Sequence, residues 1–221
     1  MTSLVLTTCP VIIPPREGVV ESWTHHHHHV VVNGAHDHWT PILQGRGWLT
    51  HTDPARRNLG CPTSWNLAFI EASRRAYRWV IILSQSTALA AGTAEFANWI
   101  ERRAPADRIV QTSFHFHCIA IPVAVWRRVG GFDESLPIFA DIDFYRRAEL
   151  AGIPPYGRLT LAGLDERCAA ARAGAIPESL YDLDAERYAT KWGGPARAET
   201  LTQPRWEPVA THHCGTGRGD A

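Results

Sequence analysis

The sequence predicts an α/β fold in which a mostly parallel central sheet carries helices on both faces. Short apolar runs alternate with longer segments of helical periodicity through about the first hundred residues, a pattern typical of such sheets. Several of the apolar runs end abruptly in polar residues. Because sheets of this class bind ligands at the carboxyl ends of their strands, we expect a ligand site where these polar residues meet.

Strands are predicted where short apolar runs stand between turn residues. The first covers 3–8 and is followed by several prolines. The second lies within 28–37, where three valines lead into an Asn-Gly turn. The other strand-like segments are 79–87 and 108–122.

Helices are predicted where apolar residues recur at helical spacing and suitable residues stand at the ends. Thr63 or Ser64 can cap one helix and Thr93 another, and glycines close two later ones. The predicted helices are 16–23, a segment starting near 63, and 92–104, 140–152 and 177–194. We expect 1–203 to form one domain and 204–221, which lack a clear period, to form an irregular tail.

The composition excludes several classes of partner. Lys plus Arg and Asp plus Glu both number 22 in 221 residues, so no net charge draws the chain to nucleic acid. No segment approaches the roughly 20 apolar residues of a membrane span, and the apolar start lacks the basic leader of a signal peptide. The five cysteines are scattered without a Cys-x-x-Cys pair. A reducing, cytoplasmic location is therefore expected.

Three segments resemble the family 2 glycosyltransferases, which have the GT-A fold. They are "NLGCPTSWNLAF", "VGGFDESLPIFADIDFYRRAELAG" and "YATKWGG", and they follow the family's order over roughly residues 3 to 194. The resemblance implies a Rossmann-like GT-A sheet. It also implies inverting transfer of a hexosyl or deoxyhexosyl group from a nucleotide-diphosphate sugar, such as a UDP-sugar, to an acceptor hydroxyl.

A hydroxyl is a weak nucleophile, so a carboxylate must take its proton as the new bond forms. The resemblance maps this base onto Asp141, with Ala140 where the family has Glu. Asp143 and Arg147 are four residues apart on the predicted helix and can pair. Asp141 points to another face, at the helix start, where the helix dipole favours the ionised form. Alternatively, Asp141 only caps the helix and the pair is a solvated face.

The acceptor side is implied by glycines and by the "YATKWGG" segment. Gly130 and Gly131 are expected to let the backbone approach a sugar. Lys191, the only lysine, is expected to face the diphosphate, although a surface position at a helix end is an equal alternative. Trp192 is expected to line the acceptor cleft. The implied acceptor or sugar-binding residues are Gly130, Gly131, Asp143, Lys191 and Trp192.

The family usually holds a divalent metal with an Asp-x-Asp element after the fourth strand. Here the matching place reads Ser84-Gln85-Ser86, and hydroxyls and an amide are poor ligands for Mn²⁺ or Mg²⁺. Three alternatives stay open. In the first, a cation such as Arg57, Lys191 or Arg218 replaces the metal. In the second, the metal is held by the diphosphate and by other residues such as His213. In the third, the chain does not catalyse.

The nucleotide side is implied by analogy with the family at the strand ends. Arginine suits phosphate and an asparagine amide suits a base edge. The implied nucleotide-sugar-binding residues are Thr8, Pro10, Arg16, Asn33, Arg57, Asn66, Ser84 and Ser86.

Two other functions remain as alternatives. A degenerate GT-A fold could bind a nucleotide sugar or glycan without turnover, because the usual carboxylates are missing. A metal carrier would use the run of five histidines, 25–29. Successive strand residues point to opposite faces, however, so one site built from all five is not expected.

Overall fold

The computed structural model of the chain describes residues 5–11, 21, 23–24, 27–34, 38–84, 87–89, 92–112, 118–153, 156–159, 164–166 and 178–209. Within 5–11, 87–89, 111–112, 156–159 and 164–166 it describes the backbone alone. No helix among the described residues is long and apolar enough to cross a membrane.

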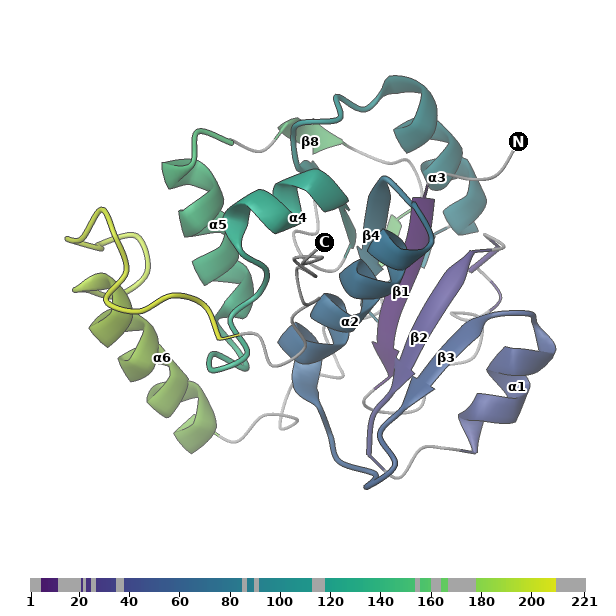
Figure 1. The fold of residues 1–221 in the computed structure, drawn as a ribbon, viewed down its shortest axis with the longest axis horizontal. Coiled ribbons are helices and arrows are strands. Elements are labelled where there is room, and N and C mark those ends of the chain that lie inside the picture. Colours follow the sequence, from purple (N-terminus) through teal and green to yellow (C-terminus); the bar gives the residue numbers. More distant parts are fainter. Residues whose placement is uncertain are drawn as a thin grey trace, which may run out of the picture.

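A seven-stranded mixed sheet forms the centre of the fold (Figure 1). In spatial order its strands are β3 (Leu49–Thr52), β2 (His28–Val32), β1 (Val5–Val11), β4 (Trp79–Leu83), β7 (Cys118–Pro122), β6 (Val110–Thr112) and β8 (Tyr156–Leu159). Strands β1 to β4 pair in parallel, whereas β7 runs antiparallel to β4 and β6. The parallel arrangement predicted for the first part of the chain is therefore confirmed, and the whole sheet is mixed. A second, antiparallel pair joins β5 (Thr87–Leu89) to β9 (Leu164–Glu166).

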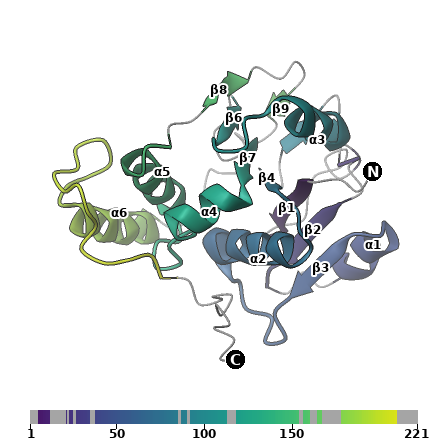
Figure 2. The same cartoon turned by 45° about the horizontal axis from the view of Figure 1, so that its top comes forward.

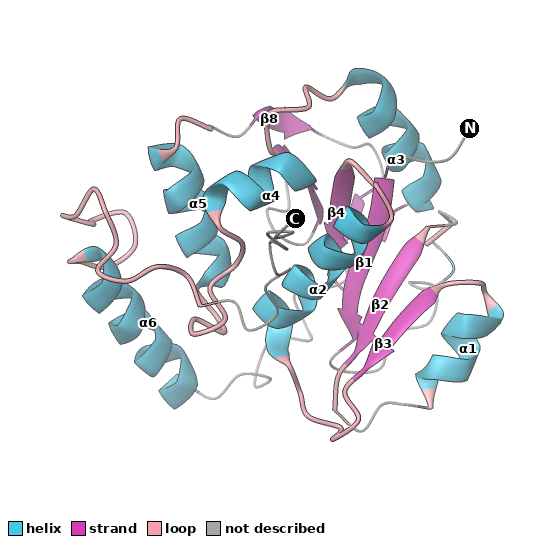
Figure 3. Cartoon of the chain, viewed as in Figure 1, coloured by secondary structure: helices cyan, strands magenta, loops and turns pink. Residues whose placement is uncertain are grey.

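Six helices are present in the described part of the chain (Figure 3). They are α1 (Trp39–Gly45), α2 (Gly60–Arg74), α3 (Gly92–Arg103), α4 (Val123–Val129), α5 (Ala140–Leu150) and α6 (Glu178–Trp192). The predicted helices 92–104, 140–152 and 177–194 are confirmed as α3, α5 and α6. The predicted helix 16–23 falls almost entirely outside the described residues.

The start of α2 differs from the prediction. Neither Thr63 nor Ser64 caps the helix, which begins at Gly60 in a left-handed conformation with φ of 74°. Pro62 stands in the first turn, where a helix tolerates a missing backbone donor. Ser64 lies inside the helix, and its hydroxyl donates back to the carbonyl of Gly60 over 2.6 Å. The helix therefore starts four residues earlier than an N-cap at Thr63 would give.

The segment 108–122 is two strands rather than one. Strand β6 pairs antiparallel with β7, and the residues between them lie outside the described part. A single apolar stretch reads the same whether or not it reverses direction, so the pattern alone could not reveal the turn. Helices α1 and α4 and strands β3, β8 and β9 were not predicted at all, and β5 shares only Thr87 with a predicted segment.

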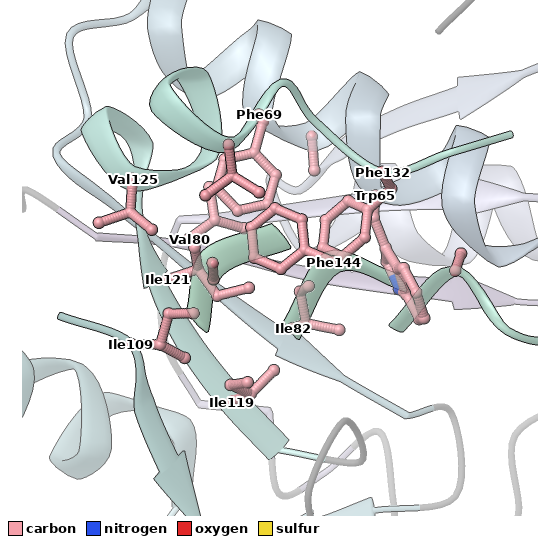
Figure 4. Close-up of a cluster of buried hydrophobic side chains, with 14 of the residues drawn as sticks. Trp65, Phe69, Val80, Ile82, Ile109, Ile119, Ile121, Val125, Phe132 and Phe144 are labelled. Carbon is pink, nitrogen blue, oxygen red and sulfur yellow. The ribbon is translucent and has the colours of Figure 1, made fainter. Parts of the chain in front are cut away.

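Alternation along the strands divides the core into two clusters, one on each face of the sheet. Val80 and Ile82 of β4 join Ile119 and Ile121 of β7 beneath α2, α4, α5 and α6 (Figure 4). The intervening residues of the same strands face the other cluster, with α1 and α3. Figure 2 shows α2 and α3 on opposite sides of the sheet. Helices thus cover both faces, as predicted.

One edge of the sheet collects the features relevant to function. The arrowheads of β1, β2 and β3 point to the lower end of the molecule in Figure 1. Helices α2, α5 and α6 all begin at that same end. Strand ends and helix starts together make the edge at which α/β sheets bind ligands.

Candidate functional site

Asp141 lies in the first turn of α5, at the edge described above. Its side chain is half-buried, and Oδ1 accepts a hydrogen bond from the backbone N–H of Ile142 over 2.8 Å. Burial, together with the negative charge of Asp141, raises the pKa of the Cys61 thiol to about 12. Cys61 belongs to the first turn of α2. The Asp141 charge therefore acts across to the start of α2.

Tyr145 lies one turn further along α5 and marks the inner side of this position. Burial and the charge of Asp141 both raise the pKa of its hydroxyl. On the outer side, Ile142 is exposed. Asp141 itself is partly exposed, which suits a carboxylate that meets a ligand.

Asn33, at the end of β2, has a structural partner on each side of its amide. Its Oδ1 accepts from the N–H of Leu59 over 2.8 Å, and its Nδ2 donates to Ser64 Oγ over 3.2 Å. The side chain is buried. Asn33 therefore anchors the start of α2 to the sheet, and its carbonyl oxygen is already engaged inside the protein.

Arg57 lies in the loop between β3 and α2, and its backbone carbonyl accepts a hydrogen bond from the N–H of Gly34. The guanidinium pairs with Asp53 through Nε–Oδ2 and Nη2–Oδ1 distances of 2.8 and 3.0 Å. These hydrogen bonds lower the pKa of Asp53 to about 2. The Arg57 side chain is nevertheless 71% exposed. It is an accessible cation on a residue whose backbone contacts Gly34, just after β2.

Asn66 does not face a nucleotide, and this expectation is corrected. Its Nδ2 donates to the Phe132 carbonyl and to Glu134 Oε1, over 2.9 and 2.8 Å. Its Oδ1 accepts from the N–H of Phe132 and the indole of Trp126, over 2.9 and 3.0 Å. All the hydrogen-bonding capacity of the buried amide is used to hold the loop after α4.

The two glycines of that loop are enclosed by protein. Gly131 has a φ of 80°, and a Cβ there would lie 3.2 Å from Asn66 Oδ1. Gly130 has a φ of 91°, and a Cβ would lie 3.3 Å from Pro208 Cγ. Left-handed backbone and close approach explain why glycine fits both positions. The close neighbours are side chains of this chain, not the sugar that the resemblance implied.

A buried ionic cluster joins α6, α5 and the loop after α4. Lys191 Nζ lies 2.6 Å from Asp133 Oδ2 and 2.8 Å from Asp143 Oδ1, with all three side chains fully buried. Asp143 also pairs with Arg147 Nη2 over 2.7 Å and accepts from the Trp192 indole over 2.9 Å. The predicted Asp143–Arg147 pair is confirmed, but it is buried rather than solvated.

This cluster changes the roles expected for three residues. Lys191 and Trp192 have no exposed surface, so the predictions that they meet a diphosphate and line an acceptor cleft are wrong. Asp143 is equally enclosed. One signal in the sequence pointed to this: Asp184, Tyr188, Lys191 and Trp192 share one face of a helix by spacing, and all four are buried.

Asp184 is a residue that sequence reasoning missed. Its Oδ2 accepts from the backbone N–H groups of Ile138 and Phe139, over 2.7 and 2.8 Å, directly before α5. The side chain is 1% exposed, and burial raises the pKa of the carboxyl. It connects α6 to the turn that leads to Asp141.

Some predicted residues cannot be placed by side chain. Arg16, Ser86, His213 and Arg218 lie outside the described residues, and for Thr8 and Pro10 the backbone alone is described. Strand β1 lies between β2 and β4; Thr8 is paired with both neighbours, whereas Pro10 is paired with β2. Ser84 follows β4 and is half-buried.

The donor groups for a metal are sparse at this edge. Within the described ranges, no group of three or more His, Cys, Asp or Glu side chains could hold an ion. The residues described here therefore do not fit a divalent cation held by the protein, and we derive no step through one.

The histidine run is divided between different surroundings. The His28 ring lies 4.4 Å from the Trp48 ring in a tilted arrangement, whereas burial lowers the pKa of His29 to about 4. His27 shares a hydrogen bond with the Tyr77 hydroxyl. These three do not converge on one point, and the remaining two histidines lie outside the described residues.

No protein-family model and no curated protein matches the chain. Solved structures do. Mannosyltransferase PcManGT from Pyrobaculum calidifontis, in complex with GDP-Man and Mn²⁺, gives a TM-score of 0.51 at 13% identity over 76% of this chain and 59% of that chain. S. aureus TarS 1–349 in complex with UDP gives 0.47 at 11% identity, over 65% and 54%. A cytidylyltransferase from Leptospira borgpetersenii gives 0.48 at 8% identity, over 84% and 94%.

These similarities concern the fold. The mannosyltransferase, with a TM-score of 0.51, is the structure on which the similarity of fold rests. The chain spans 59% of that protein's length. The mixed sheet with helices on both faces fits this similarity. In its fold, therefore, the chain resembles the GT-A glycosyltransferases.

Proposed function

We propose that the chain is an inverting glycosyltransferase that moves a sugar from a nucleotide-diphosphate donor to an acceptor hydroxyl. The observation that carries the proposal is the position of Asp141. A partly open carboxylate stands at the start of α5, beside the start of α2, at the carboxyl edge of the parallel strands. Ligands of α/β sheets bind at this edge, and a transferred hydroxyl needs such a base.

The proposed reaction is a single displacement. The Asp141 carboxylate accepts the proton of the acceptor hydroxyl while the hydroxyl oxygen bonds to the anomeric carbon of the donor sugar. The bond from that carbon to the diphosphate oxygen breaks, and the nucleoside diphosphate leaves with the electron pair. One attack on one face inverts the configuration at the anomeric carbon.

The leaving diphosphate needs positive charge, and we assign this role to Arg57. Its side chain is exposed, its backbone contacts Gly34 just after β2, and its planar donors suit phosphate oxygens. Ser84, at the end of β4, is proposed to lie nearby. Thr8, Pro10, Arg16 and Ser86 remain proposed nucleotide-side residues.

A panel of ligands tests the proposal on the intact chain. UDP, GDP, dTDP and CMP, with their common sugars, are screened for thermal stabilisation with and without Mn²⁺. A ligand present at 100 times its dissociation constant stabilises by about 2.7 kcal/mol, a shift of roughly 5–11 °C at this size. Stabilisation by one nucleotide, followed by release of that nucleotide from its sugar in the presence of hydroxyl acceptors, supports transfer. No stabilisation by any of them contradicts the proposal.

A second function is favoured by the missing carboxylates. Ala140 replaces an acid beside Asp141, and Ser84 stands at the end of β4, where the family has an acidic element. A degenerate fold that binds a nucleotide sugar or a glycan would keep stabilisation by one nucleotide in the same panel. It would show no turnover with any acceptor.

A further inference from the structure

In the first turn of α5 the Asp141 carboxylate accepts one N–H, that of Ile142, but the residue before the turn adds no side-chain cap. Phe139 occupies the N-cap position and makes no capping hydrogen bond. Helices leave their first backbone N–H groups without intrahelical partners, so an uncapped first turn frays readily. Asp141 belongs to this turn. Its direction therefore depends on whatever else holds the chain at that point.

Helix α6 supplies the missing support. The Asp184 carboxylate accepts from two successive N–H groups, those of Ile138 and Phe139. The Phe139 ring packs against Tyr181 and Tyr188 of the same helix, at centroid distances of 5.2 and 5.6 Å. Backbone and side chain are thus both fixed immediately before α5.

The same helix holds α5 on the far side of Asp141. Lys191 Nζ and the Trp192 indole both reach Oδ1 of Asp143, over 2.8 and 2.9 Å. Asp141 therefore lies between two points that are anchored on α6, one at 138–139 and one at Asp143. In Figure 1 the two helices lie side by side.

Burying Asp184 costs free energy that these contacts must offset. The side chain is 1% exposed, and its Oδ1 has no hydrogen-bond partner within the described part of the chain. A buried carboxylate with one oxygen unpaired is unfavourable. A carboxylate at this place is explained by what its other oxygen does, which is to hold the turn before α5.

We propose that Asp184 is a positioning residue for Asp141: through the N–H groups of Ile138 and Phe139 it fixes the direction in which the Asp141 carboxylate leaves α5. The proposal rests on the proposed function in that it takes Asp141 to be the base. Asp184 touches no reacting group. Its effect on transfer would come from geometry, since a displacement of about 1 Å can cost about 100-fold in rate.

Cys61 reports the position of Asp141 without any need for a substrate. Burial is the larger cause of the raised pKa of Cys61 and the Asp141 charge adds to it, so removing that charge should increase the thiolate fraction of Cys61. Since the thiolate is the nucleophile, alkylation by iodoacetamide at pH 8.5 should become about threefold to tenfold faster in Asp141→Asn. Trypsin releases residues 58–74, which contain Cys61 as their one cysteine, so mass spectrometry reads this site separately.

A double-mutant cycle separates positioning from general loosening. Asp184→Ala should change the Cys61 alkylation rate by about threefold or more when Asp141 is present. In the Asp141→Asn background it should change the rate by less than about twofold. An equal change of the rate in both backgrounds overturns the proposal, and so does the absence of a change in either. Asp184→Asn keeps an oxygen that can accept both N–H groups and should restore the wild-type rate, whereas the matched control Asp182→Ala, exposed on the same helix, should leave it unchanged.

Transfer kinetics provide the second readout once a donor is identified. Asp184→Ala should lower kcat about 10- to 100-fold with little change in the donor KM, and Asp184→Asn should recover most of that loss. An unchanged kcat overturns the proposal. If the chain transfers no sugar, the proposed function fails, and the Cys61 cycle still decides whether Asp184 positions Asp141.

Discussion

The ammonium group of Lys191 lies 2.6 Å from Oδ2 of Asp133 and 2.8 Å from Oδ1 of Asp143, and none of these three side chains is exposed. This contact joins the end of α6 to α5 and to the loop after α4. Burial opposes ionisation of Asp133, but hydrogen bonds from Lys191 and Ser135 outweigh it and lower the pKa of that carboxyl. The lysine is a structural link of the domain.

Replacing this lysine should destabilise the whole fold. Lys191→Met removes the charge that two buried carboxylates share, and breaking a buried ion pair typically costs about 3–5 kcal/mol. Urea denaturation measures the loss. Arg187→Ala, an exposed change on the same helix, should stay within about 0.5 kcal/mol of wild type. A loss below about 1 kcal/mol for Lys191→Met would contradict the structural role.

Gly131, in the loop after α4, and Gly152, after the end of α5, give a matched pair of substitutions. Gly131 and Gly152 have φ of 80° and 72°, but a Cβ meets Asn66 Oδ1 at 3.2 Å in the first and nothing within 4 Å in the second. Gly152→Ala should cost about 1–2 kcal/mol, which is the left-handed conformation alone. Gly131→Ala should cost more, because Asn66 must also move. Equal unfolding free energies for the two variants would argue against the tight packing at Gly131.

His29 should make stability sensitive to acid. Burial lowers its pKa from 6.5 to about 4, so between these values the unfolded chain binds a proton that the folded chain refuses. Its contribution to stability is therefore full above pH 6.5 and is lost as the pH falls toward 4, by about 3 kcal/mol in total.

Unfolding free energies at pH 7, 5.5 and 4 test this contribution. His29→Leu should flatten the loss between pH 6.5 and 4, whereas the exposed control His38→Gln should keep it. If His29→Leu and wild type lose stability in parallel over this range, the assignment of His29 as a buried, neutral side chain is wrong.

Arg57 should contribute to binding of the diphosphate and not of the rest of the nucleotide. Arg57→Ala is expected to weaken binding of the nucleoside diphosphate found in the ligand panel by about tenfold. Binding of the corresponding monophosphate should change much less. Asp53→Asn releases the guanidinium from its partner and should not weaken diphosphate binding. Equal losses for both ligands would place Arg57 outside the diphosphate site.

Much of the fold followed from local patterns. Strand β4 and helices α3, α5 and α6 were predictable because their periodicity and terminal residues are strong. Other features depend on contacts between distant segments. The reversal between β6 and β7 and the early start of α2 leave no clear periodic signal.

The candidate site was likewise predictable only in part. Asp141 at a helix start and the Asp143–Arg147 pair follow from spacing along one helix. Asp184, by contrast, acts on a turn 45 residues before it, and no local pattern shows this. Lys191 was misassigned because the "YATKWGG" resemblance was followed, although the spacing of Asp184, Tyr188, Lys191 and Trp192 places Lys191 on a buried helix face. In the structure it faces two buried carboxylates.

Asp141→Asn tests the central claim most directly. The change keeps size and the hydrogen bond to the N–H of Ile142 but removes the base. With the donor identified by the ligand panel, nucleoside diphosphate release is followed in the presence of acceptor, and donor affinity is measured separately by calorimetry. The account predicts a fall of about 10²–10⁴ in kcat with donor affinity nearly unchanged. An unchanged rate would show that Asp141 is not the base and would contradict the account.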